Sequence, residues 1–189
     1  MSATHEDKQF DSIIYSETGI YDQEFYDCTF LKCDFSNAVV SSSKFNDCIF
    51  VDCNLSMTNL SQSVMNNVKF RNCKILGVKF NYCHDFIFEV SFENCILDYS
   101  SFEKRKMSKT RFVNTSLKGV DFGGTDLKQS KFQNTNLDEA IFHSTNLQEA
   151  DLSSAINYII DPDENIIKKA RFSREGLHGL LYKYKIVIE

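Results

Sequence analysis

The sequence predicts an all-β solenoid in which the chain turns a corner every five residues and completes one square coil every twenty. Every fifth residue is apolar over residues 25–80 and again over residues 92–152. The residue two positions earlier is small or β-branched throughout both runs, apart from Gln23 and Arg105. One proline and seven glycines in 189 residues are too few for a loop-rich domain. Such regularity indicates a repeat that points one large and one small residue inward per five.

The most regular stretch is TDLKQSKFQNTNLDEAIFHSTNLQEADL, residues 125–152, which follows the pattern A(D/N)Lxx. On this pattern the chain resembles the pentapeptide-repeat proteins over roughly residues 10–157. The resemblance implies a right-handed quadrilateral β-helix. We therefore expect an all-β fold of that kind, closed by a short C-terminal helix cap.

The solenoid is expected to span residues 10–157, preceded by a mobile tail at residues 1–9, where Lys8 does not fit the small inward position. Inside the solenoid the five-residue phase slips by two residues, so a jog or bulge is expected near residues 83–90. The apolar residues of that segment are expected to close the seam: Phe86, Ile87 and Phe88.

Residues twenty apart are expected to stack, because neighbouring coils lie about 4.8 Å apart. In the second half this gives two phenylalanine columns on opposite faces: Phe92, Phe112 and Phe132, and Phe102, Phe122 and Phe142. The seven cysteines follow the small inward position, with Cys33, Cys53 and Cys73 in one column. We interpret them as small buried residues rather than a metal or redox site, because no C-x2-C pair exists and their side chains point in parallel.

The repeat ends after Leu152, and residues 158–189 are expected to form a C-terminal cap. Ser173 fits a helix N-cap, and the apolar residues after it recur at helical spacing. A short strand is expected at residues 186–188. Capping alone and capping with homodimer formation are both open, and the resemblance implies dimerisation in the topoisomerase-directed members. The residues expected at a dimer contact are Leu177, Leu180, Leu181, Tyr184 and Ile186.

No enzyme activity, cofactor or metal is expected, because the chain has no GxGxxG, P-loop, HExxH or GxSxG motif. No run of about 18 apolar residues points to a membrane partner. The net charge of -5 argues against direct nucleic-acid binding. Seven cysteines read as free thiols favour a reducing compartment, so a cytoplasmic location is expected.

Charge is banded along the chain. Residues 10–60 carry eight acidic side chains against two lysines, whereas residues 61–83 and 104–118 carry basic side chains and no acidic ones. The charge density of the acidic band is comparable to that of duplex DNA. The candidate partner-binding residues are therefore Asp22, Glu24, Asp27, Asp34, Asp47 and Asp52. Arg105 occupies a small inward position and is expected to turn outward.

Two hypotheses about function follow. In the first, the protein is a non-enzymatic DNA mimic, because the chain resembles the Qnr-type quinolone-resistance proteins and the microcin immunity protein. That resemblance implies an acidic rod that binds DNA gyrase or topoisomerase IV and protects it from quinolone-like poisons. The chain departs from those proteins in its basic bands and in lacking a long loop between coils. In the second hypothesis, the solenoid is a scaffold or binding module that contacts another protein through the basic bands.

Overall fold

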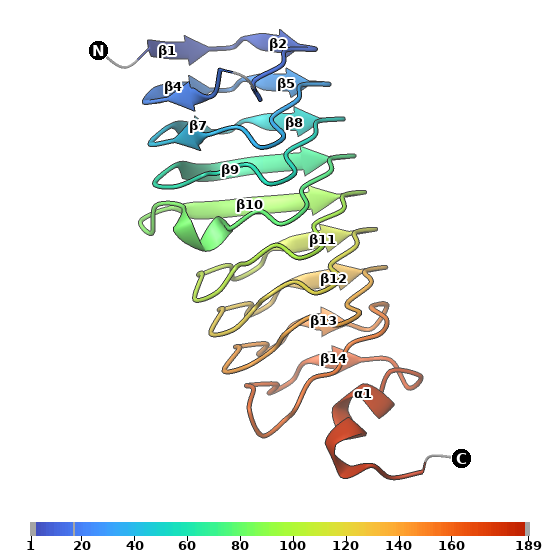
Figure 1. Cartoon of the computed structure of the whole chain (residues 1–189). Helices are drawn as coiled ribbons and strands as arrows, with labels where there is room; N and C mark the ends of the chain where they lie inside the picture. Colours follow the sequence, from blue (N-terminus) through green and yellow to red (C-terminus); the bar gives the residue numbers. More distant parts are fainter. Residues whose placement is uncertain (1–2, 17, 188–189) are drawn as a thin grey trace.

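The structure is a computed structural model that describes residues 3–16 and 18–187. The chain forms a right-handed parallel β-solenoid of about eight turns, with one short α-helix at its C-terminal end (Figure 1). The coils stack into a rod, so the first and last coils lie at opposite ends. The all-β fold expected from the five-residue repeat is confirmed.

The strands are short, because each coil leaves a face after a few residues. They are β1 (Ala3–Glu6), β2 (Gln9–Asp11), β3 (Ile20–Tyr21), β4 (Gln23–Tyr26), β5 (Thr29–Leu31), β6 (Val40–Ser41), β7 (Lys44–Asn46), β8 (Ile49–Val51), β9 (Val64–Arg71), β10 (Phe88–Glu93), β11 (Arg111–Val113), β12 (Lys131–Gln133), β13 (Asp151–Leu152) and β14 (Arg171–Phe172). The helical segments are the 3-10 turns η1 (Phe80–Tyr82) and η2 (Tyr182–Tyr184) and the α-helix α1 (His178–Leu181).

Strand pairing is parallel, and its register shows the length of the coil. The main sheet runs β1-β4-β7-β9-β10-β11-β12-β13-β14, with β2, β5 and β8 joining it at β9, while β3 and β6 form a separate pair. Phe25 pairs with Phe45, twenty residues on, whereas Phe70 pairs with Phe92, twenty-two residues on. The register shift lies between Phe88 and Val90, within the segment where the sequence phase slips. The left edge of the rod steps inward after β10 (Figure 1).

The corners have a left-handed backbone. The residue two positions after the large inward one recurs with a positive φ of 49° to 66°. Aspartate and asparagine tolerate this conformation better than most residues, and they are frequent there. At Gly119 the requirement is stricter, because φ is +61° and a Cβ would lie 2.7 Å from the Tyr99 ring.

Phenylalanines fill the core as continuous columns. One column of stacked rings runs from the partly buried Phe10 to Phe132 through both halves of the rod, with neighbouring ring centroids 4.6 to 5.5 Å apart. A second column stacks Phe80, Phe102, Phe122 and Phe142. The first column crosses the register shift without a gap, because the two extra residues lie on another side of the coil.

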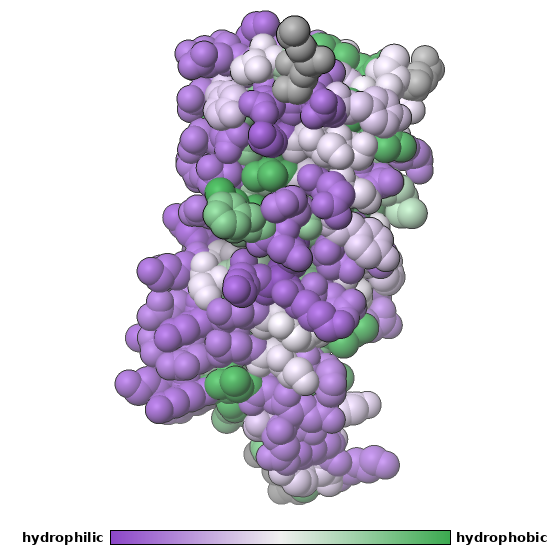
Figure 2. Space-filling view, turned by 90° about the vertical axis from the view of Figure 1, so that its left-hand side faces the viewer, coloured by the Kyte–Doolittle hydropathy of each residue, from purple (hydrophilic) through white to green (hydrophobic). Residues whose placement is uncertain are grey.

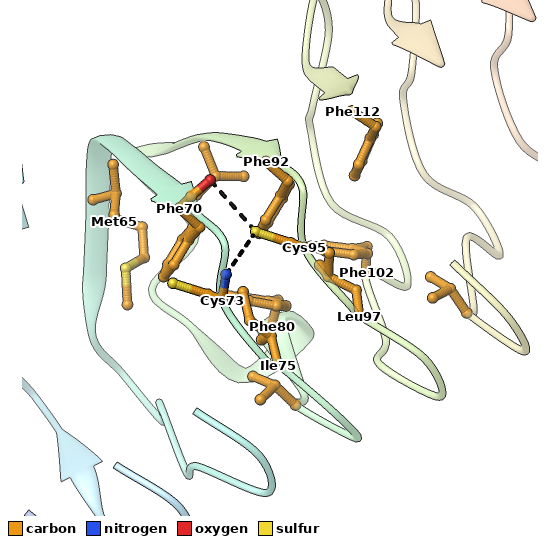
Figure 3. Packing of buried hydrophobic residues seen from close by; sticks show 14 of the residues in the cluster. Met65, Phe70, Cys73, Ile75, Phe80, Phe92, Cys95, Leu97, Phe102 and Phe112 are labelled. Atoms are coloured by element: carbon orange, nitrogen blue, oxygen red, sulfur yellow. Dashed lines mark hydrogen bonds between the residues drawn. The ribbon is translucent and has the colours of Figure 1, made fainter. Parts of the chain in front are cut away.

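Cysteines fill small inward positions and make the same hydrogen bonds as serine and threonine there. Cys53 Sγ donates to the carbonyl oxygen of Phe30, twenty-three residues back, as Thr58 Oγ1 does to that of Phe35. Cys95 Sγ donates to the Phe70 carbonyl and accepts from the Cys73 N–H (Figure 3). All seven cysteines are buried and free. Burial raises the pKa of the Cys48 and Cys83 thiols to about 12, so both stay protonated and unreactive near neutral pH.

The solenoid begins earlier and ends later than the repeat pattern indicates. The expectation of a mobile tail over residues 1–9 is wrong for residues 3–9, because β1 pairs with β4 from Ala3 to Glu6. Residues 1 and 2 lie outside the described residues. At the other end Leu152 pairs with Phe172, so a further coil follows residue 157. Strand pairing needs only backbone groups, so it continues where the side-chain pattern fails.

The C-terminal cap packs through glycines. Ser173 Oγ accepts a hydrogen bond from the Gly176 N–H at 3.0 Å. The expectation that Ser173 is the helix N-cap is wrong, because α1 begins at His178 and its N-cap residue is Leu177. A Cβ at Gly179 would lie 2.0 Å from the Tyr158 carbonyl oxygen, so the helix approaches the last coils only because glycine is there. The expected strand at residues 186–188 is wrong for Ile186 and Val187, which are unpaired, and Ile188 lies outside the described residues.

Candidate functional site

The structure gathers most of the predicted partner-binding acids on one side of the first three coils. Four of the six lie on β4 and at the corners that border β4 and β7: Asp22, Glu24, Asp27 and Asp47. Glu6 and Asp7 join them, because β1 pairs with β4. We call these six residues the acidic face. Sequence reasoning missed Glu6 and Asp7 by treating their segment as a tail.

Asp34 and Asp52 lie elsewhere on the coil. Asp52 is at the corner after β8, where its Oδ1 accepts from Asn72 Nδ2 at 3.0 Å. It is the first member of a column of hydrogen-bonded side chains that continues through Asn72, Asn94, Asn114 and Asn134, with donor–acceptor distances of 3.0 to 3.2 Å. Asp34 Oδ1 accepts from the Ser36 N–H at 2.9 Å. Both carboxylates therefore lie away from the acidic face, where they accept hydrogen bonds from their own chain.

The charge of the aspartate column is not dictated by the backbone. Asp7, Asp27 and Asp47 are stacked at one corner with φ of 50°, 50° and 54°. Equivalent corners elsewhere hold Lys109 at φ 66° and Gln129 at φ 60°. The left-handed conformation therefore accepts cationic and neutral side chains. Aspartate suits it, but asparagine suits it as well, so the backbone does not require the like charges that the three aspartates place close together.

Charge on the acidic face is partly compensated. Glu24 Oε1 lies 2.7 Å from Lys44 Nζ, and Glu24 Oε2 accepts from the Tyr26 hydroxyl at 3.0 Å. Hydrogen bonds from Lys44 and Tyr26 lower the pKa of the Glu24 carboxyl. Asp47 accepts from Asn67 Nδ2 at 2.6 Å and has no cationic partner in the described part of the chain. Asp7, Asp27 and Asp47 thus have no ion pair among the described residues.

The inserted segment at residues 84–88 is anchored by Arg105. The expectation that Arg105 turns outward is wrong, because its side chain is only 4% exposed. Its Nε donates to the Phe80 carbonyl at 3.0 Å. Serine, threonine and cysteine make the equivalent bond from the small inward position of other coils, as Ser100 Oγ does to the Ile75 carbonyl. Its Nη2 donates to the His84 carbonyl at 3.2 Å, and its Nη1 pairs with Asp85. His84 and Asp85 of the inserted segment thus supply acceptors that let an arginine fit this position.

The apolar residues of the inserted segment divide between core and surface. Phe88 packs edge-on against Phe80 and Phe102 and lies 4.6 Å from the Arg105 guanidinium carbon. Phe86 is 85% exposed, so the expectation that it closes the seam is wrong. The side of the rod in Figure 2 is mainly hydrophilic, with hydrophobic surface at the height of β10. A groove of about 750 Å³ lies beside the segment, lined by Tyr82, Phe86, Phe88, Lys104, Arg105 and Lys106 among others.

The family model for a pentapeptide repeat region matches residues 23–84 and 86–156, more than half of the chain. The chain belongs to the pentapeptide repeat family. The residue between the two matched parts, Asp85, lies in the inserted segment that Arg105 anchors.

Among solved structures, this pentapeptide repeat protein is similar to QnrB1, described as a plasmid-mediated fluoroquinolone resistance protein. Trypsin-treated forms of two QnrB1 variants match with TM-scores of 0.64 and 0.65, at 18% identity, over 100% of this chain and 99% and 100% of theirs. Full-length QnrB1 matches with a TM-score of 0.50 at 18% identity, over 97% of this chain and 100% of its own. At this identity the likeness shows the fold alone. No curated protein matches the sequence.

The C-terminal cap of the pentapeptide-repeat solenoid leaves several of the predicted dimer residues uncovered. Leu177, Tyr184 and Ile186 are 44%, 57% and 55% exposed. Leu180 packs partly buried against the core of its own chain, and Leu181 is partly buried. Leu177, Tyr184 and Ile186 are thus the most exposed of the five.

The described residues were also compared with what a metal site and a membrane-spanning helix require. Within residues 3–16 and 18–187, no group of three or more histidine, cysteine, aspartate or glutamate side chains is arranged to hold a metal ion. No helix in the same ranges has the length and apolar character needed to cross a bilayer.

Proposed function

We propose that this protein binds a type II topoisomerase, DNA gyrase or topoisomerase IV, by presenting the acidic face where the enzyme would bind DNA. Binding in this way protects the enzyme from quinolone-like poisons. The observation that carries the proposal is the stacked, exposed column of corner aspartates, Asp7, Asp27 and Asp47, whose charge the backbone does not require.

The spacing of the acidic face supports a DNA-like surface. Its six carboxylates lie on three successive coils, which span about 10 Å at strand spacing. Duplex DNA carries about six phosphates over the same length, counting both strands. Lys44 offsets one of the six carboxylates through its pair with Glu24, and Asp7, Asp22, Asp27 and Asp47 have no ion pair among the described residues. The likeness in fold to a fluoroquinolone resistance protein is consistent with this proposal.

Gyrase supercoiling in the presence of a fluoroquinolone tests the proposal. The purified protein should restore supercoiling, and the double variant Asp27→Lys/Asp47→Lys should not. Lysine fits these corners, because Lys32 and Lys109 adopt φ of 52° and 66° at equivalent positions. The matched control is Glu139→Lys/Glu149→Lys, which makes the same change in charge at corners of φ 57° and 59° near the other end of the rod.

The control variant should protect as well as the unmodified protein. Equal protection by the Asp27→Lys/Asp47→Lys variant would exclude the acidic face as the contact. Absence of protection by the folded, unmodified protein against both gyrase and topoisomerase IV would exclude the function itself.

The second candidate function is a binding module for another protein, and the groove beside the inserted segment favours it. Phe86 is exposed next to Lys104 and Lys106, which offers an aromatic and cationic contact. In that case Phe86→Ala should weaken partner capture, and reversal of the acidic face should not.

We also propose that the C-terminal cap forms a homodimer contact through Leu177, Tyr184 and Ile186, which are exposed apolar side chains on one short segment. Sedimentation of Tyr184→Asp should then give half the mass of the unmodified protein at high salt.

A reducing location such as the cytoplasm suits the seven buried free thiols.

A further inference from the structure

One edge of the solenoid carries charged side chains at six successive levels, one level per coil. The edge follows the corner between β4 and β5 and its equivalents down the rod. Lys69, Ser91, Arg111 and Lys131 are consecutive partners in strand register, and Lys69 continues the column of Thr29 and Ile49. Asp27, Asp47 and Lys109 lie at left-handed corners two residues before a member of that column. Glu89 lies two residues before Ser91 within β10, at the register shift. We call Asp27, Asp47, Lys69, Glu89, Lys109 with Arg111, and Lys131 the charged edge. All seven are exposed.

The signs along the charged edge form a self-complementary series. From the N-terminal end the levels read negative, negative, positive, negative, positive, positive. Read from the opposite end with every sign inverted, the series is the same. A second copy lying antiparallel along this edge would therefore meet an opposite charge at each of the six levels.

The charges of the charged edge differ from others on the described surface in forming no ion pair there. The described residues contain vertical ion pairs elsewhere, such as Lys44 with Glu24 at 2.7 Å and Lys118 with Asp138 at 2.9 Å. No member of the charged edge takes part in such a pair in the described ranges. Arg111 lies directly opposite Lys131, an arrangement of like charges, and Lys131 lies opposite Asp151 on its other side.

We propose that two copies of this chain associate side by side and antiparallel through the charged edge. The two-fold axis lies between the levels of Lys69 and Glu89, which places Lys69 against Glu89 of the partner copy. Asp47 then meets the partner's Lys109 and Arg111, and Asp27 meets the partner's Lys131. The same contacts repeat on the other side of the axis, as a two-fold interface requires.

The contact has a defined length. Six levels span about 24 Å at strand spacing. One level further out, Asp7 of one copy would face Glu149 and Asp151 of the other. All three side chains are acidic, so the charges are no longer complementary at that level. Asp151 lies 3.6 Å from Arg171 of its own chain, which partly offsets its charge.

This association goes beyond the proposed topoisomerase binding and does not depend on it. It covers Asp27 and Asp47, so a topoisomerase and a second copy would compete for the same aspartates. It also differs from a contact through the C-terminal cap, because apolar contacts persist in salt whereas this one weakens as salt screens the charges.

Sedimentation velocity at low and high salt tests the association. The mass of the unmodified protein at about 20 mM salt should be twice its mass at about 0.5 M salt, where the Debye length falls to a few ångströms. A cap dimer would carry two charged edges and could extend the assembly at low salt, so the same comparison is made with Tyr184→Asp, whose mass should double. A mass independent of salt at concentrations up to about 100 μM would overturn the proposal.

A charge-swap pair makes the test specific. One variant is Asp27→Lys/Asp47→Lys and the other is Lys109→Glu/Arg111→Glu/Lys131→Glu. The substitutions suit their positions, because Glu149 occupies a left-handed corner and Asp151 pairs with Lys131 in the same column. Circular dichroism identical to that of the unmodified protein shows that each variant is folded.

Each variant alone should lose the doubling of mass at low salt. An equimolar mixture should regain it. On one side of the axis the introduced lysines of one copy meet the introduced glutamates of the other, and on the other side the original cations meet the original aspartates. Loss of association that mixing does not restore would show that the edge pairs differently or not at all, and would overturn the antiparallel arrangement.

Discussion

Replacing Arg105 with threonine should release the inserted segment while restoring the ordinary repeat at that position. Threonine or serine fills the same small inward position in neighbouring coils, and Thr125 Oγ1 donates to the Phe102 carbonyl at 2.8 Å. The Arg105→Thr variant therefore keeps the hydrogen bond to the Phe80 carbonyl. It loses the bond to the His84 carbonyl, the pair with Asp85 and the contact with Phe88.

The magnitude follows from what is buried. A hydrogen bond from a charged donor contributes about 1.5–3 kcal/mol, and the contact of the guanidinium with an aromatic ring about 0.5–1 kcal/mol. The Asp85 side chain is 94% exposed, so its pair with Arg105 adds little after screening by solvent. We expect the variant to lose about 2–4 kcal/mol of stability, a fall in Tm of about 5–12 °C for a chain of this size.

Limited proteolysis with chymotrypsin measures the segment itself. Phe86 is an exposed cleavage site in the segment that Arg105 anchors. Loosening this segment by about 2 kcal/mol should therefore raise the rate of cleavage at Phe86 more than tenfold. Asp85→Ala is the matched control and should change both Tm and cleavage little. If Arg105→Thr melts and is cleaved like the unmodified protein, Arg105 does not anchor the segment and this reasoning is wrong.

Three further predictions concern the core, the cap and pH. Phe112→Ala, in the middle of the continuous ring column, should cost about 3–5 kcal/mol in urea unfolding, whereas Phe86→Ala at the surface should stay within about 0.5 kcal/mol. Gly179→Ala should detach α1 from the Tyr158 carbonyl, seen as faster hydrogen exchange in the cap with the coils still protected. The pKa of Glu24 is lowered from 4.5, so its contribution to stability is present above pH 4.5 and is lost as pH falls through the lowered value. The stability difference between the unmodified protein and Glu24→Gln should therefore shrink on acidification, as measured by urea unfolding across pH.

Much of the fold follows from a pattern that repeats within five residues. The large and small inward positions identify the phenylalanine columns and the buried cysteines, because a side chain that points inward in one coil points inward in the next. The two-residue phase slip also marks where the register changes from twenty to twenty-two. These features depend on local spacing, so the sequence alone is sufficient to predict them.

The acidic face is only partly predictable. The sequence identifies the aspartates, but which of them share a side depends on how the coils are stacked. Asp34 and Asp52 are close to the others in the sequence, yet they lie around further corners and bond to Ser36 and Asn72. Glu6 and Asp7 belong to the face because backbone pairing extends β1 beyond the last side chain that fits the pattern.

The sequence by itself determines the coil, the core and the position of the break, since each depends on which residues recur at five-residue spacing. Tertiary structure alone decides the rest. Arg105 points inward because the inserted segment brings the His84 carbonyl and Asp85 within its reach, and the spacing of the repeat contains no information about those acceptors. The order of charges along the charged edge likewise depends on the register after the break, because two extra residues decide which side chains become vertical neighbours.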